Sequence, residues 1–172
     1  MRWEALFSDL EGQLGSARED EWRAEVSERT RGERIAVDLA SRIAAAQGTT
    51  LGLVLLDGER ITGEVEDSAR GWLLLVDAAA REHLVPIQAV ASVTGLGRAA
   101  HHVTEVERRL GLSHVLRALS RDRSRVRVRT VGGEVHGVIG AVLADHVDVT
   151  MDGPGGGRVS VPYATVLEVV SA

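Results

Sequence analysis

The chain has 172 residues, of which five are aromatic, and its formal net charge is −5. All 20 basic residues are arginine, and the chain has no cysteine. This composition excludes thiol nucleophiles, disulfides, iron–sulfur clusters and thiolate zinc sites, and it also excludes a Schiff-base or pyridoxal-phosphate lysine. The apolar share of 44% and the charged share of 26% are those of an ordinary soluble globular protein.

No segment has the roughly 18 consecutive apolar residues of a membrane helix. The first residues include acids at Glu4, Asp9 and Glu11 and lack the apolar run of a secretory signal peptide. We therefore expect no membrane partner and a cytoplasmic location.

Residues 1–47 are predicted to form an N-terminal helical region, because their apolar residues recur at spacings of three and four. Gln47-Gly48 is expected to end the last helix of this region. Its apolar stripe fits two roles equally well, namely packing on the rest of the protein or a helix–helix seam between two copies. The candidate interface residues are Trp3, Leu6, Phe7, Leu10, Trp22 and Val26.

From Thr49 the apolar period changes to two, and glycine-containing breaks such as Asp57-Gly58 interrupt it, which indicates strands and turns. We predict a first β domain over 48–97, a helical linker over 98–123 and a second β domain over 124–172. The expected strands are 51–56, 60–66, 72–77, 82–86 and 90–94 in the first domain, and 125–131, 134–142, 145–151, 158–162 and 166–170 in the second.

The two β domains repeat each other over about 45 residues. Residues 56–65 match 130–139, and the Val-Pro pair at 85–86 matches the one at 161–162 after two extra residues in a turn. Five short strands leave exposed edges as an open sheet, and closure into a small barrel removes them. The predicted fold class is therefore mainly β with α additions: N-terminal helices followed by two tandem five-stranded barrels joined by a helix.

The strings VLLDGERITGEV and VRTVGGEVHGVI resemble the first motif of the Sm-like family, including its Hfq branch. This resemblance implies Sm-like small barrels, which commonly assemble by pairing their edges. Hfq reads RNA with a Lys-His pair near its last turn, and here those places hold Pro86-Ile87 and Pro162-Tyr163. The resemblance therefore implies the fold without the RNA-binding residues.

The whole chain also resembles an actinobacterial family of unknown function, some members of which are described as Fis-like regulators. The string RRLGLSHVLRAL at 108–119 is similar to the turn and recognition helix of a helix-turn-helix motif. That motif needs a small residue four places before its turn glycine, and this chain has Glu107 there, before Gly111.

Nine arginines and three acids lie in residues 98–129, so one basic stripe sits inside an acidic chain. Along RDRSRVRVR the arginines alternate, so that Val126 and Val128 are expected to point inward and the arginines outward. These arginines could bind phosphates, or they could form a solvated face that pairs with acidic surfaces. The candidate nucleic-acid-binding residues are Arg108, Arg109, Arg117, Arg121, Arg123, Arg125, Arg127 and Arg129.

The remaining polar motifs do not indicate catalysis. The six histidines lack metal-binding spacing, no nucleophile-elbow motif occurs, and the glycine cluster at 153–157 lies between two strands as a hairpin tip. We predict no catalytic residue, no metal and no cofactor, and therefore a protein that is not an enzyme. The expected function is a non-enzymatic binding or scaffold module, one form of which is a regulator that binds nucleic acid through the basic linker and the first strand of the second β domain. The alternative is a structural protein–protein module that forms homo-oligomers through barrel edges and N-terminal helices.

Overall fold

The computed structural model describes residues 37–101, 111–153 and 156–171, and these residues are mainly β with few helices. The N-terminal interface candidates and most of the predicted helical region lie outside the described residues. The elements are α2 (Leu39–Ala44), β1 (Thr50–Leu55), β2 (Arg60–Ala69), β3 (Trp72–Val76), β4 (Glu82–Pro86), η1 (Ile87–Ala89), β5 (Val90–Thr94), α4 (Leu112–Asp122), β6 (Arg125–Thr130), β7 (Gly133–Val142), β8 (His146–Met151), β9 (Arg158–Pro162), η2 (Tyr163–Thr165) and β10 (Val166–Ser171).

The two halves repeat the same order of elements: a helix, four strands, a single 3₁₀ turn and a fifth strand. The strand order is β5-β1-β2-β3-β4 in the first repeat and β10-β6-β7-β8-β9 in the second. Equivalent residues also pair in the same register, since Trp72 lies opposite Pro86 and His146 lies opposite Pro162. The repeated unit includes its helix, because α2 packs against β2 as α4 packs against β7.

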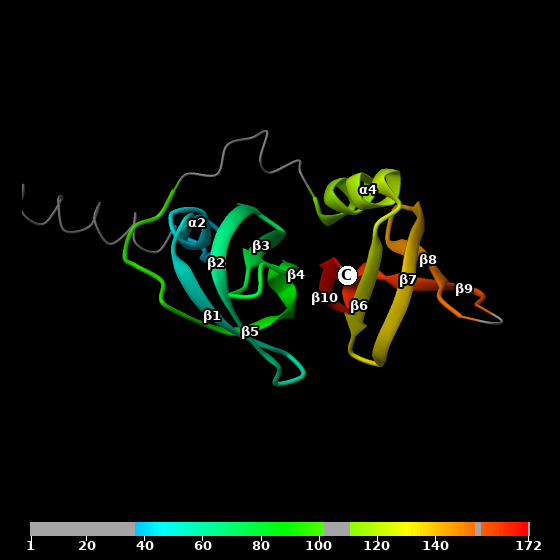
Figure 1. The fold of residues 1–172 in the computed structure, drawn as a ribbon. Coiled ribbons are helices and arrows are strands. Elements are labelled where there is room, and N and C mark those ends of the chain that lie inside the picture. The colour runs from blue at the N-terminus through cyan, green and yellow to red at the C-terminus, as the bar shows by residue number, and fades with distance from the viewer. Residues whose placement is uncertain (1–36, 102–110, 154–155, 172) are drawn as a thin grey trace, which may run out of the picture. The chain divides into compact units, whose positions relative to one another are not determined.

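The strands of both repeats form one open antiparallel sheet of ten strands (Figure 1). The prediction of two separately closed barrels is therefore not confirmed. Within the described residues β4 pairs with β10 of the other repeat, Leu84 lying opposite Val169 and His83 opposite Val170. This pairing supplies hydrogen-bond partners to one edge of each repeat. Closing each repeat into a barrel would have satisfied the same backbone groups.

The two hydrophobic clusters cross the line between the repeats. Leu167 of β10 packs in the cluster of the first repeat, whereas Trp72 and Leu84 pack in the cluster of the second. The predicted inward side chains of β6, Val126 and Val128, are both buried in the second cluster. Each repeat thus completes part of its core with side chains from the other.

Glycines inside the long strands allow two strands to lie unusually close. A Cβ on Gly63 would lie 2.7 Å from the carbonyl oxygen of Val76, and a Cβ on the equivalent Gly137 would collide with the carbonyl oxygen of Thr150. Shortly after each glycine the pairing register shifts, as expected for a bulge.

Candidate functional site

The structure divides the predicted basic stripe into two groups. Arg117, Arg121 and Arg123 are exposed on and just after α4, and we call them the arginine face. Arg127 and Arg129 on β6 are partly covered and lie among carboxylates. Arg108 and Arg109 fall in 102–110, outside the described residues.

The arginine face follows from the amphipathic pattern of α4. Leu116 is fully buried, and the partly buried apolar residues of α4 pack on the second cluster. Arg117 and Arg121 are four residues apart and so share the opposite side of the helix. The helix stops at Arg123, whose backbone adopts the left-handed conformation (φ 52°). Within the described ranges, no carboxylate forms an ion pair with these three arginines.

Arg125 begins β6 as an exposed side chain and forms an ion pair with Asp152 at 2.9 Å. It therefore differs from the arginine face, because its charge is already partly neutralised. Pairs of this exposed kind contribute little to stability.

Arg129 contacts carboxylates from both repeats. Its guanidinium lies 3.5 Å from Asp57 and 3.4 Å from Glu59 of the first repeat, and 3.3 Å from Glu168 of β10. Burial acts to lower the pKa of Arg129, but Glu168, Glu59 and Asp57 outweigh it, and the pKa is raised above its usual value. Arg127 lies 3.5 Å from Glu134 and 3.8 Å from Glu168.

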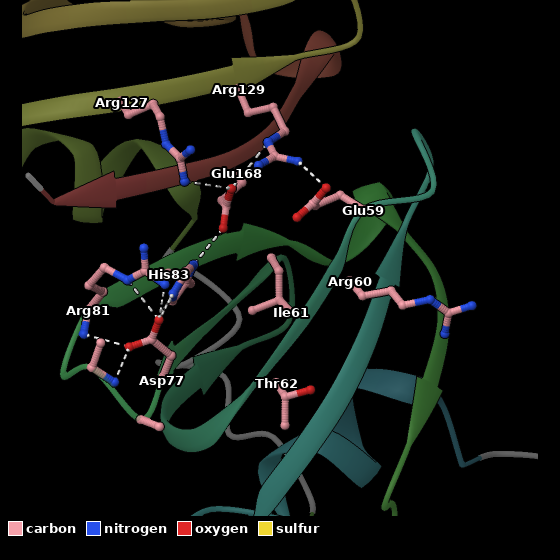
Figure 2. A pocket seen from close by; sticks show the side chains of 12 residues that line it. Glu59, Arg60, Ile61, Thr62, Asp77, Arg81, His83, Arg127, Arg129 and Glu168 are labelled. Carbon is pink, nitrogen blue, oxygen red and sulfur yellow. Dashed lines mark hydrogen bonds and ion pairs between the residues drawn. The ribbon is translucent and has the colours of Figure 1, made fainter.

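His83 of β4 bridges the two repeats at the same place (Figure 2). Its Nδ1 lies 2.6 Å from Oε1 of Glu168, and its Nε2 lies 3.2 Å from Oδ2 of Asp77. His83 is 6% exposed and Glu168 is 1% exposed. Two further atoms of this cluster are buried without a hydrogen bond, Arg129 Nε and Glu168 Oε2.

Asp77 anchors the turn that leads into β4. It accepts hydrogen bonds from the backbone N–H groups of Ala79 and Arg81 and from the Arg81 side chain. The hydrogen bonds from Arg81 hold the pKa of the Asp77 carboxyl well below its usual range, and those from His83 and Ala79 add to the effect. Asp77 is therefore a carboxylate at any ordinary pH.

A cavity of about 530 Å³ borders these side chains. The charged residues that line it come from both repeats, and the guanidinium of Arg60 points away from the cluster (Figure 2). The remaining cationic groups of the lining, on Arg81, Arg127 and Arg129, already face carboxylates. We therefore regard this group of side chains as a contact between the repeats. We call it the junction cluster, and its members are Asp77, Arg81, His83, Arg127, Arg129 and Glu168.

Sequence reasoning identified the arginines but missed His83, Asp77 and Glu168. A signal for Glu168 was present, since it is the one charged residue of the strand VLEVVS, which is otherwise apolar up to its terminal Ser171. Both faces of β10 are buried, and a carboxylate there needs cationic partners. Its partners come from β4 and β6, which only the fold brings together.

No three histidine or acidic side chains of the described part of the chain converge on one point that could hold a metal ion. Ser160 donates a hydrogen bond to Asp148 at 2.6 Å, and His146 pairs with the exposed Asp145 at 2.7 Å, but these two pairs are separate. Among the described helices none is long and apolar enough to cross a membrane.

Comparison with known proteins adds no relative to this picture. No protein-family model matches the chain, and no curated protein matches it. The geometry of the arginine face and of the junction cluster is therefore the basis for any functional conclusion.

Proposed function

We propose that the protein is a non-enzymatic cytoplasmic module that binds the phosphate backbone of nucleic acid through its arginine face. The observation that carries this proposal is the exposure of Arg117, Arg121 and Arg123, without an acidic partner among the described residues. Guanidinium groups bind phosphate oxygens in a bidentate manner, and contacts of this kind supply affinity without reading sequence.

Two features limit the kind of binding. The chain has only five aromatic residues, and Trp72, the only tryptophan described, is buried, so stacking on bases is not favoured. Arg127 and Arg129 are already neutralised by Glu168 and its neighbours, so we leave them out of the interface. Three phosphate contacts predict a slope of log affinity against log salt of about −2.7 on duplex DNA and about −2.1 on a single strand.

The test is fluorescence anisotropy with a labelled DNA duplex and a labelled single-stranded RNA over a series of salt concentrations. The triple variant Arg117→Glu, Arg121→Glu, Arg123→Glu is expected to lose salt-dependent binding. The matched control changes three exposed arginines outside the arginine face, Arg60, Arg70 and Arg98, to Glu and so alters the net charge equally. Equal losses in both variants, or no binding by the natural chain, would overturn the proposal.

A second candidate function is a structural module that assembles through sheet edges. It is favoured by the open sheet, in which β5 and β9 each pair on one side only among the described residues. The five-stranded repeat supports the further proposal that each half is a Sm-like unit whose edge pairs with the next unit. Light scattering distinguishes the candidates, because a monomeric mass at high protein concentration contradicts edge assembly.

A further inference from the structure

His83 lies between two carboxylates, one from each repeat. Glu168 on β10 faces its Nδ1 at 2.6 Å, and Asp77 before β4 faces its Nε2 at 3.2 Å. A neutral imidazole carries one N–H, whereas the imidazolium carries two and can donate to both carboxylates at once. We propose that protonated His83 is a latch that ties β4 to β10, and that loss of its proton loosens the contact between the repeats.

Charged groups from both repeats surround His83. Asp77 remains ionised because hydrogen bonds from Arg81 lower the pKa of its carboxyl, and Glu168 faces Arg127 and Arg129. The carboxylates outnumber the guanidinium groups in the connected network. Its members besides His83 are Asp57, Glu59, Asp77, Glu134 and Glu168 on the acidic side, Arg81, Arg127 and Arg129 on the basic side, and His136 next to Glu134.

The latch lies where two neighbouring strands of the sheet pair over the fewest residues. Only Leu84 and His83 of β4 pair with β10, whereas β6 pairs with β10 over five residues. His83 also lines the cavity at the junction, which gives protons a route to the buried ring. Because these two strands share few backbone hydrogen bonds, a side-chain contact at this position contributes much of what holds β4 to β10.

The outer edges of the sheet lack this arrangement. The position of His83 in β4 is occupied by Val159 in β9, and the position of Glu168 in β10 is occupied by Ser92 in β5. The latch is therefore not part of the repeated framework. Among the described edges it occurs where β4 meets β10, and it shares no residue with the arginine face.

Trp72 provides the readout, because it is 5% exposed and packs in the cluster that crosses the junction. In the full chain, Trp3→Phe and Trp22→Phe leave Trp72 as the only tryptophan. Because only the imidazolium can donate to both carboxylates, quenching is compared at about pH 6, below the usual pKa of a histidine, and at about pH 9, well above it. We expect acrylamide to quench Trp72 more strongly at the higher pH, and His83→Gln to abolish that difference.

The matched control is His146→Gln, which removes a histidine that pairs with the exposed Asp145. This variant should keep the pH-dependent quenching. An absent pH difference in the parent chain, or the same difference in His83→Gln, would overturn the latch. If His83→Gln does not fold, nitrogen NMR of the parent chain decides: both ring nitrogens of His83 are expected to carry protons at about pH 6, and a neutral ring contradicts the proposal.

Discussion

The inner edges of the sheet, β4 and β10, differ from the outer edges, β9 and β5, although the repeat makes them equivalent. Leu84 of β4 corresponds to Ser160 of β9, and Leu167 of β10 corresponds to Ala91 of β5. The inner residues are buried and the outer ones are exposed. The same backbone register thus forms both the paired inner edges and the unpaired outer edges of the described sheet. The side chains decide which edge receives a partner.

The outer edges carry features that limit unwanted pairing. β5 presents small side chains, and β9 begins at Arg158 and ends at Pro162. Charged residues, proline and short strands are common means of blunting an exposed edge. The junction, in contrast, combines large apolar side chains with the junction cluster. This comparison predicts that substitutions at inner positions are costly and that equivalent outer substitutions are mild.

The largest effect is expected for Glu168→Ala. It leaves the buried His83 and the partly covered Arg129 without their shared partner, a change that costs about 3–5 kcal/mol in the free energy of unfolding. Urea denaturation measures it, with Ser92→Ala on β5 as the matched outer control, expected within about 0.5 kcal/mol of the parent. Similar losses in the two variants would contradict the contrast between the edges.

Leu167→Ala is the next largest change. It removes a fully buried side chain from the cluster of the first repeat and should cost about 2–5 kcal/mol. The outer counterpart already has Ala91, so Ala91→Ser is the matched control and should change stability by less than about 0.5 kcal/mol. Thermal and urea unfolding should both show a larger loss of stability for Leu167→Ala than for Ala91→Ser. A mild Leu167→Ala would show that the first repeat does not depend on the second.

Gly137→Ala tests what the two repeats share. The added Cβ meets the backbone of Thr150, and the equivalent Gly63→Ala meets the backbone of Val76, so each should cost about 1–3 kcal/mol. Gly71→Ala is the control, since nothing lies within 4 Å of its Cβ position. Urea denaturation measures both variants. A loss of stability in only one of them would mean that the close strand approach is not a common feature of the repeats.

The smallest effect on stability is expected for Ala91→Leu. The position is exposed, so the free energy of unfolding should stay within about 0.5 kcal/mol of the parent. The variant gives the outer strand β5 the apolar residue that the inner strand β10 has at the equivalent position, and light scattering should detect more association than in the parent. An unchanged mass would show that this side chain does not decide edge pairing.

Much of the local structure was predictable from the sequence. The alternation around Val126 and Val128 correctly predicted which side chains of β6 point inward, and the repeated sequence indicated that the two halves have equivalent strands. The union of the two repeats was not predictable, because nothing local shows that β4 meets β10. Pairing of the arginines with acidic surfaces was one of the two alternatives from the sequence, but the sequence could not show that Arg127 and Arg129 would be the ones to meet carboxylates of the junction.

The exchange of core residues between the repeats has a consequence for synthesis on the ribosome. The first repeat is translated first, but its core includes Leu167, which belongs to the last strand of the second. Until that strand emerges, the nascent first half exposes the β4 edge and an incomplete apolar core, the kind of surface that attracts chaperones. Its folding is therefore completed only after nearly all of this sequence has been translated.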